Sequence, residues 1–100
     1  YASAYTRLRK VFYNNLRGDT MQVKDAVAGR IRGLCRERGI KVNELANLSG
    51  VTPSTVYSLL SPERRDVSII TIKKLCDGLN ITLGCFFSAD IFDMLEQEII

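Results

Sequence analysis

The feature that most constrains the fold is a helical pattern that stops at one glycine and restarts three residues later. Residues 45–60 read LANLSGVTPSTVYSLL, and Gly50 interrupts the apolar spacing in the middle. Glycine adopts a left-handed backbone at little cost, so it commonly ends a helix. Thr52 can cap a new helix through its hydroxyl, and Pro53 suits the first helical position, where its missing N–H costs nothing. We therefore expect two short helices joined by a tight turn.

The same helical spacing continues on both sides of this turn, and no strand-like alternation of useful length is present. We expect helices over residues 23–38, 42–48, 53–60, 69–79 and 82–87, with left-handed caps at Gly39 and Asn80. Ser88 should cap a further helix from Ala89 to about residue 98. The expected fold class is all-α. The residues expected to face inward are Val27, Ile31, Leu34, Cys35, Leu45, Val56, Leu59, Leu60, Ile72, Leu75, Cys76, Leu79, Leu83, Phe86 and Phe87.

Three segments differ in charge along a chain whose length fits one domain. Residues 1–20 carry four basic side chains and one acidic, residues 21–89 carry ten and six, and residues 90–100 carry four acidic and no basic. The net charge of the chain is +3. The counts show that residues 1–89 are basic and that residues 90–100 are acidic. This balance fits a polyanionic partner and also fits many ordinary proteins.

Residues 1–20 form a basic amphipathic extension, for which we expect an added N-terminal helix. Its apolar stripe consists of Ala4, Leu8, Val11, Phe12 and Leu16. The codons for residues 17–19 can form a purine-rich run that recruits bacterial ribosomes just before Met21. Residues 1–20 are therefore either a native extension or translated leader or artificial sequence, and the N-terminal peptide mass of the native protein decides between them.

The composition excludes several functional classes. The chain contains no histidine, which removes histidine-based catalysis and histidine-containing zinc sites. Three widely spaced cysteines, Cys35, Cys76 and Cys85, are expected to be free thiols in a reducing cytoplasm. No paired carboxylates, phosphate-binding glycine loop or nucleophile motif is present, so we expect no enzyme activity, no cofactor and no metal. We also expect no membrane contact and no small-molecule substrate.

The spacing from Val42 to Ser61 is that of a helix-turn-helix motif. Ala46 is small where the two helices should cross, Gly50 lies in the turn, and Val56 and Leu59 should be the inward residues of the second helix. These requirements are independent of one another, so their agreement is more specific than a single glycine motif.

The residues from 23 to 87 resemble the Cro/lambda-repressor type of helix-turn-helix domain, the xenobiotic-response-element family of bacterial and phage regulators. The segments NELANLSGVTPSTVYSLL (43–60) and SIITIKKLCDGLNITLGCFF (68–87) carry the resemblance. It implies a five-helix domain over residues 21–88 whose third helix lies in the DNA major groove. A small cytoplasmic regulator of transcription is the function that it implies.

The resemblance also assigns expected roles to individual residues. The positions at which the family presents base-reading side chains hold Thr52, Pro53, Ser54 and Ser58. The side chains expected to contact phosphates, or phosphates and bases, are Asn43, Thr55, Tyr57, Arg64, Arg65, Lys73 and Lys74. The alternatives are that Ser54 and Thr55 only start the helix, that Arg64 and Arg65 belong to a solvated loop, and that Tyr57 rests on its neighbours.

The chain departs from the family at the start of the second helix. The family commonly has a threonine or serine cap followed by a phosphate-binding glutamine, where this sequence has Lys41 and Val42. Asn43 or Lys41 would have to replace that contact. The recognition helix also lacks arginine, glutamine and asparagine after Thr52, so it cannot form bidentate contacts with purines.

The C-terminal residues 89–100 should form an acidic helix whose apolar side is either part of the domain or a dimer contact. Phe92, Leu95 and Ile99 lie on that side, and we favour the dimer contact. A homodimer would suit an inverted-repeat operator, because one helix-turn-helix reads one half-site. The rival function is a protein-interaction module of the same fold, such as the antitoxin of a toxin–antitoxin pair.

Overall fold

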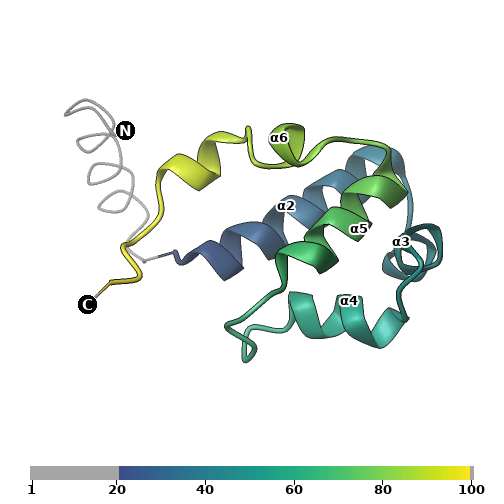
Figure 1. The fold of residues 1–100 in the computed structure, drawn as a ribbon, viewed down its shortest axis with the longest axis horizontal. Coiled ribbons are helices and arrows are strands. Elements are labelled where there is room, and N and C mark those ends of the chain that lie inside the picture. Colours follow the sequence, from purple (N-terminus) through teal and green to yellow (C-terminus); the bar gives the residue numbers. More distant parts are fainter. Residues whose placement is uncertain (1–20, 100) are drawn as a thin grey trace.

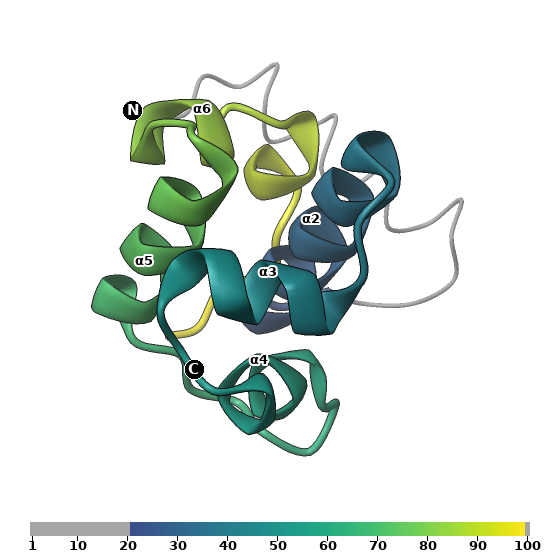
Figure 2. The same ribbon diagram turned by 90° about the vertical axis from the view of Figure 1, so that its right-hand side faces the viewer.

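The computed structural model describes residues 21–99, and every helix expected between residues 23 and 87 is present there. The expected N-terminal helix and its apolar stripe lie outside the described residues. Figure 1 shows α3 at the right, α4 along the lower edge and the C-terminal segment at the left, and Figure 2 shows α2 and α5 on opposite sides of α3. The elements are α2 (Val23–Arg38), α3 (Val42–Ser49), α4 (Pro53–Leu60), α5 (Ile69–Leu79), α6 (Leu83–Phe86) and the 3-10 helix η1 (Asp90–Asp93).

The helix ends are fixed by local chemistry that the sequence already indicates. Gly39, Gly50 and Asn80 follow α2, α3 and α5 with φ values of 63°, 69° and 59°, as expected for left-handed caps. Thr52 accepts a hydrogen bond from the Thr55 amide at 3.3 Å and so caps α4. Ser68 accepts one from the Ile70 amide at 3.1 Å and caps α5. These expectations are confirmed.

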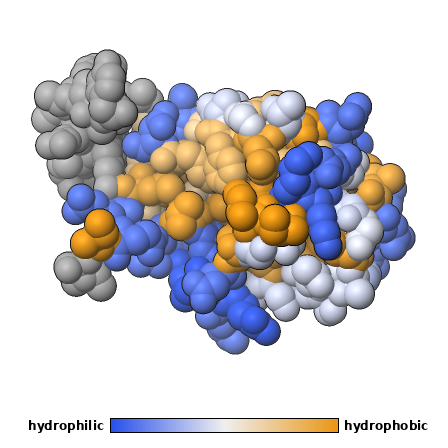
Figure 3. All heavy atoms as spheres, viewed as in Figure 1, coloured by the Kyte–Doolittle hydropathy of each residue, from blue (hydrophilic) through white to orange (hydrophobic). Residues whose placement is uncertain are grey.

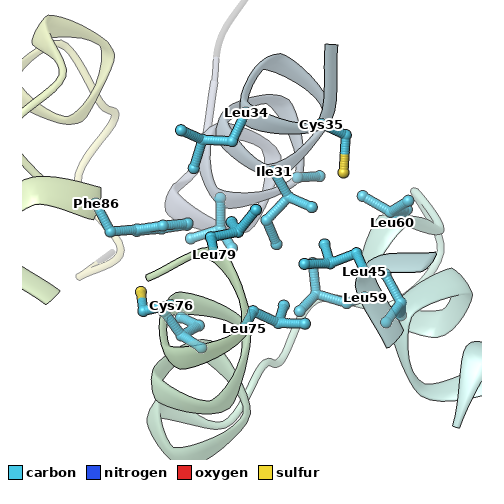
Figure 4. Packing of buried hydrophobic residues seen from close by; sticks show 14 of the residues in the cluster. Ile31, Leu34, Cys35, Leu45, Leu59, Leu60, Leu75, Cys76, Leu79 and Phe86 are labelled. Carbon is cyan, nitrogen blue, oxygen red and sulfur yellow. The ribbon is translucent and has the colours of Figure 1, made fainter. Parts of the chain in front are cut away.

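One apolar core joins α2 to α6, and Figure 4 shows its labelled side chains converging from α2, α3, α4, α5 and α6. Thirteen of the fifteen residues expected to face inward are buried, while Leu83 and Phe87 are half-buried against the same cluster. In α3, Ala46 is fully buried, as expected for the small residue where the two helices cross, whereas Leu48 is 61% exposed.

The closest approach between helices lies where α5 crosses the end of α3. A Cβ atom on Gly78 would lie 2.2 Å from Ser49 Oγ, 3.0 Å from Ser49 N and 3.1 Å from the Leu48 carbonyl carbon. The Ser49 hydroxyl is buried there without a hydrogen-bond partner among residues 21–99. The α3–α5 contact therefore depends on the missing side chain of Gly78, for which the sequence pattern gave no signal.

The expected C-terminal helix to residue 98 is wrong, because the structure has only the short 3-10 helix η1, preceded by Ala89. The Ser88 hydroxyl does not cap a helix but donates to the Cys85 carbonyl at 2.8 Å. Phe92 packs its ring 4.9 Å from that of Phe87 and 5.9 Å from that of Phe86. The Glu96 amide then donates to the Met21 carbonyl at 2.9 Å. These contacts with the domain hold the segment in an extended path that a continuing helix could not follow.

No helix within residues 21–99 is long and apolar enough to cross a bilayer. The same residues contain no group of three or more potential metal ligands. Cys35 and Cys76 are buried free thiols whose pKa values are raised by burial, and Cys85 is an exposed free thiol.

Candidate DNA interface

The first turn of α4 stands out from one edge of the domain. Figure 2 shows α4 at this edge, with α3 lying across its inner side. Val56 and Leu59 are 0% and 4% exposed and fix the inner face of α4 in the core. Thr52, Pro53 and Ser54 are exposed on the outer side, as expected for residues that approach a ligand.

The hydroxyl groups of this turn are partly occupied by one another. Thr52 Oγ1 lies 3.0 Å from Ser54 Oγ and 2.9 Å from Thr55 Oγ1, in addition to capping the Thr55 amide. Thr52 and Thr55 therefore use their hydroxyls to build the helix start. Ser54 keeps a hydroxyl lone pair, and Thr52 and Pro53 present carbon atoms that can meet a thymine methyl group.

A shallow hollow brings the second turn of α4 beside the following loop. Ser58 and Arg64, six residues apart, line it together. The full lining is Thr55, Ser58, Leu59, Arg64, Asp66, Val67, Ser68 and Thr71. The hollow thus combines hydroxyl groups with one cation, Arg64, and one carboxylate, Asp66.

The two loop arginines have different surroundings. Arg65 forms a two-fold ion pair with Asp25, with nitrogen–oxygen distances of 3.1 and 3.2 Å, and donates to Gln22 Oε1 at 2.8 Å. The hydrogen bond from Arg65 lowers the pKa of Asp25 and raises that of Arg65. The Arg64 side chain has no ion-pair or hydrogen-bond partner among residues 21–99. Arg64 is therefore free to reach a phosphate, and the phosphate contact of Arg65 stays a prediction.

The remaining expected contacts lie at the surface of three helices. Lys73 forms an ion pair with Asp77 one turn along α5, whereas Lys74 has no such partner within the described residues. Asn43 is exposed at the start of α3, where the Glu44 carboxylate accepts a hydrogen bond from the Lys41 amide at 3.2 Å. Tyr57 is 55% exposed on α4.

The surface around α4 matches this distribution of side chains. Figure 3 shows weakly polar surface, drawn pale, over α4, next to strongly polar surface, drawn blue, over the following loop. A helix flanked by cationic groups and faced with small hydroxyl residues is suited to the major groove, which admits one helix between two lines of phosphates.

Comparison with known proteins agrees with the geometry. Residues 30–90 match the family model of the Cro/C1-type HTH DNA-binding domain. The chain belongs to this family. The crystal structure of the prophage Lp1 protein 11 is similar to this Cro/C1-type domain, with a TM-score of 0.67 and 25% sequence identity. The similarity covers 73% of this chain and 96% of that one. No curated protein shows significant sequence similarity to the chain.

Membership of the Cro/C1-type family confirms the all-α helix-turn-helix fold and a DNA-binding domain. The matched residues include α3, α4, α5 and every residue expected to contact DNA. The roles of those residues stay predictions, because family membership assigns no contact to an individual side chain of this chain.

The expected dimer contact is changed by the path of the C-terminal segment. Phe92 is packed against the core of the Cro/C1-type domain, which is the alternative that we did not favour. Leu95 is half-buried, and Ile99 is 87% exposed. Phe92 is half-buried by these contacts, and a dimer role for Phe92, Leu95 and Ile99 stays a prediction.

Sequence reasoning missed two cationic residues of α2 that contact the end of α4. Lys24 is only 2% exposed and donates to the Ser61 carbonyl, and Arg32 donates to the Leu60 carbonyl at 3.2 Å. Burial and the nearby Arg65 lower the pKa of Lys24. The sequence held one sign of this contact, a lysine at a position of α2 where the helical spacing expects an apolar residue. The partners could not be predicted, because they are backbone carbonyl groups, which every residue has.

The Asp25–Arg65 ion pair should make stability depend on acid. The folded pKa of Asp25 is below its ordinary value of 3.8, so the stabilisation is complete above that pH and is lost as the pH falls further. We expect the difference in free energy of unfolding between wild type and Asp25→Asn to shrink below pH 3.8. Urea titrations at a series of pH values measure it. In an Arg65→Met background the pH-dependent difference between Asp25 and Asp25→Asn should be smaller, because only the Gln22 amide and Lys24 then still favour the carboxylate.

Proposed function

We propose that this protein is a sequence-specific regulator of transcription that places the first turn of α4 in the major groove of double-stranded DNA. The observation that carries the proposal is the exposure of Thr52, Pro53 and Ser54 at the start of the second helix of a Cro/C1-type motif. That turn is the part of a recognition helix that contacts base edges.

The chemistry of α4 predicts a permissive reader of sequence. Serine hydroxyls donate and accept, so Ser54 and Ser58 can pair with more than one base. The helix has no arginine, glutamine or asparagine, which would make the bidentate purine contacts worth about 1–3 kcal/mol each. Part of the specificity should therefore come from the shape and deformability of the operator.

Cations around α4 should supply most of the affinity that does not depend on sequence. Arg64 follows the helix, and Lys74 lies on α5, each without an ion-pair partner among residues 21–99. Each phosphate neutralised in this way releases counterions, so binding should weaken steeply with salt. Lys73 and Arg65 would first have to exchange Asp77 and Asp25 for a phosphate.

We also propose that the protein acts in the cytoplasm as a homodimer on an inverted repeat. A single helix-turn-helix covers one half-site, and two copies about one turn of DNA apart gain both affinity and specificity. Ile99 and Leu95 are apolar residues of the C-terminal segment that lie outside the packed aromatic cluster. Sedimentation equilibrium of the full chain, alone and with operator DNA, tests this; a monomer on a single half-site would contradict it.

The direct test is in vitro selection of bound duplexes from a random pool, followed by gel shifts with the selected sequence. We expect one enriched motif and a shift that is lost as salt rises. If no duplex is retained at low ionic strength, DNA binding is refuted. A uniform pool that is retained without enrichment would leave DNA binding in place but contradict sequence-specific reading.

Base contacts and phosphate contacts should be separable by mutation. Replacing Ser54 and Ser58 with alanine should change which base pair is preferred at one or two positions of the selected motif. The free-energy difference between base pairs at those positions should change by about 1–3 kcal/mol. Arg64→Ala should instead weaken binding to all duplexes about equally and reduce the slope of log affinity against log salt by about 1. Equal effects of both changes on every sequence would contradict this division.

A protein-interaction module, such as an antitoxin, is the second candidate. The observation in its favour is the exposure of three large aliphatic side chains: Leu48, Ile69 and Ile70 are 61%, 54% and 62% exposed. Figure 3 shows a continuous apolar area, drawn orange, across the middle of one face. Capture of a partner protein that survives nuclease treatment would favour this function.

A further inference from the structure

Three cationic side chains from outside α4 donate to the carbonyl groups at its C-terminal end. Arg32 donates to Leu60 at 3.2 Å, Lys24 donates to Ser61, and Arg65 donates to Pro62 at 3.0 Å. The last carbonyls of a helix have no partner within the helix and carry partial negative charge, so cations stabilise them. The last turn of α4 contains no basic residue of its own.

The position of Lys24 is unfavourable for a positively charged side chain. It is the second residue of α2, where the positive end of the helix favours acidic side chains, and at 2% exposure it is the one buried charged residue among residues 21–99. Burial and the charge of Arg65 disfavour its ammonium form and lower its pKa. A charged group retained against these costs is expected where its hydrogen bond specifies an arrangement of elements.

The loop after α4 is also fixed to the first turn of α2. Arg65 reaches both Asp25 and Gln22, forty and forty-three residues earlier in the chain. In Figure 1 this loop runs below the N-terminal half of α2. Between the fixed points lies Arg64, whose amide donates to the same Ser61 carbonyl that Lys24 contacts, at 3.3 Å. The arrangement therefore fixes both the end of α4 and the backbone that carries Arg64.

We propose that Lys24, Arg32 and Arg65 are positioning residues that set the angle of α4 against DNA and thereby determine how well the protein distinguishes its operator from other duplexes. This proposal rests on the proposed function. We name the three side chains the α2–α4 clamp. Rotation of α4 about its buried face moves Ser54 and Ser58 relative to the base edges, whereas the long Arg64 side chain can still follow a phosphate. Loss of the clamp should therefore weaken operator binding more than binding to unrelated DNA.

The test compares Lys24→Met and Arg32→Met with a control on the same helix. Arg30 donates to the carbonyls of Phe86 and Cys85 at 2.8 and 3.0 Å, so Arg30→Met removes the same charge and the same type of bond far from α4. Dissociation constants are measured for the selected operator and for an unrelated duplex of equal length at one salt concentration.

We expect the ratio of operator to unrelated affinity to fall about tenfold in each clamp variant, the order of one charge-assisted hydrogen bond. Arg30→Met should lower both affinities by the same factor and leave the ratio unchanged. Arg32→Lys, which keeps the charge and a donor, should recover part of the ratio. Arg32 is exposed, so the arginine variants keep the test valid if Lys24→Met does not fold.

Hydrogen exchange of the amides of residues 61–67 gives a measurement that needs no DNA. These amides should exchange faster in both clamp variants and unchanged in Arg30→Met. A ratio that stays at the wild-type value in both clamp variants, or falls equally in Arg30→Met, overturns the proposal. If the wild-type protein does not prefer any operator over unrelated DNA, the proposed function is refuted. The exchange rates of residues 61–67 then still show whether the α2–α4 clamp holds the loop.

Discussion

Replacing Phe86 with alanine should lower the free energy of unfolding by about 3–5 kcal/mol, the usual range for loss of a buried aromatic ring. Phe86 is fully buried, and its ring contacts those of Phe87 and Phe92 with centroids 4.9 and 5.9 Å away. The Arg30 guanidinium lies 6.0 Å above the ring centroid. Alanine would therefore leave a cavity and also release the C-terminal segment from the aromatic cluster.

Urea denaturation followed by circular dichroism measures this loss. Domains of this size are usually stable by about 5–15 kcal/mol, so the variant should be marginal at 37 °C. Tyr57→Ala is the matched control, because Tyr57 is an aromatic residue that is 55% exposed, and its loss should change stability by less than about 0.5 kcal/mol. If Phe86→Ala were as mild as the control, the ring would not be part of the core.

Replacing Gly78 with alanine should lower the free energy of unfolding by about 1–3 kcal/mol, although alanine is the better helix former. The added methyl group would lie 2.2 Å from Ser49 Oγ and about as close as contact permits to the backbone of α3. The Ser49 hydroxyl can rotate away, but the Ser49 amide nitrogen at 3.0 Å cannot. Relief therefore requires α3 and α5 to separate.

Two further variants make this prediction specific. Gly29→Ala, in α2, should stabilise the protein by up to about 1 kcal/mol, because a Cβ atom there meets nothing within 4 Å and alanine has the higher helix propensity. Ser49→Gly should recover part of the loss in Gly78→Ala by removing the nearest atom. Thermal unfolding of the four proteins suffices. Equal stabilisation by alanine at Gly29 and Gly78 would show that the two helices do not meet closely.

Prediction from sequence succeeded wherever the determining interactions lie within one or two helical turns. The caps formed by Gly39, Thr52, Ser68 and Asn80 each depend on neighbours four or fewer residues away, so residue type and spacing were enough to place them. The inward faces followed from the three-and-four spacing of apolar residues. The helix-turn-helix motif is the sum of these local signals.

Prediction failed at the C-terminal segment because a distant contact overrode local preference. Residues 89–98 contain good helix formers with acidic residues near the start, and in isolation they favour a helix. Phe92 packs on Phe86 and Phe87, and the Glu96 amide donates to the distant Met21 carbonyl instead of to a carbonyl of its own helix. The acidic and apolar residues of this segment do separate, but they belong to a short 3-10 helix and the non-helical residues after it.

The candidate site divides in the same way. The sequence by itself determined that the start of α4 is hydroxyl-rich and has no large side chain, because that follows from the residues at 52–55, TPST. Only the tertiary structure decided which cations near it are free. Arg65 is held by Asp25, forty residues away, and Lys24 by the Ser61 carbonyl, thirty-seven residues away, while Arg64 is left unpaired within residues 21–99. The start and end of a helix depend on residues that are close in sequence. The partner of a charged side chain depends on which distant residues the fold brings within hydrogen-bonding distance.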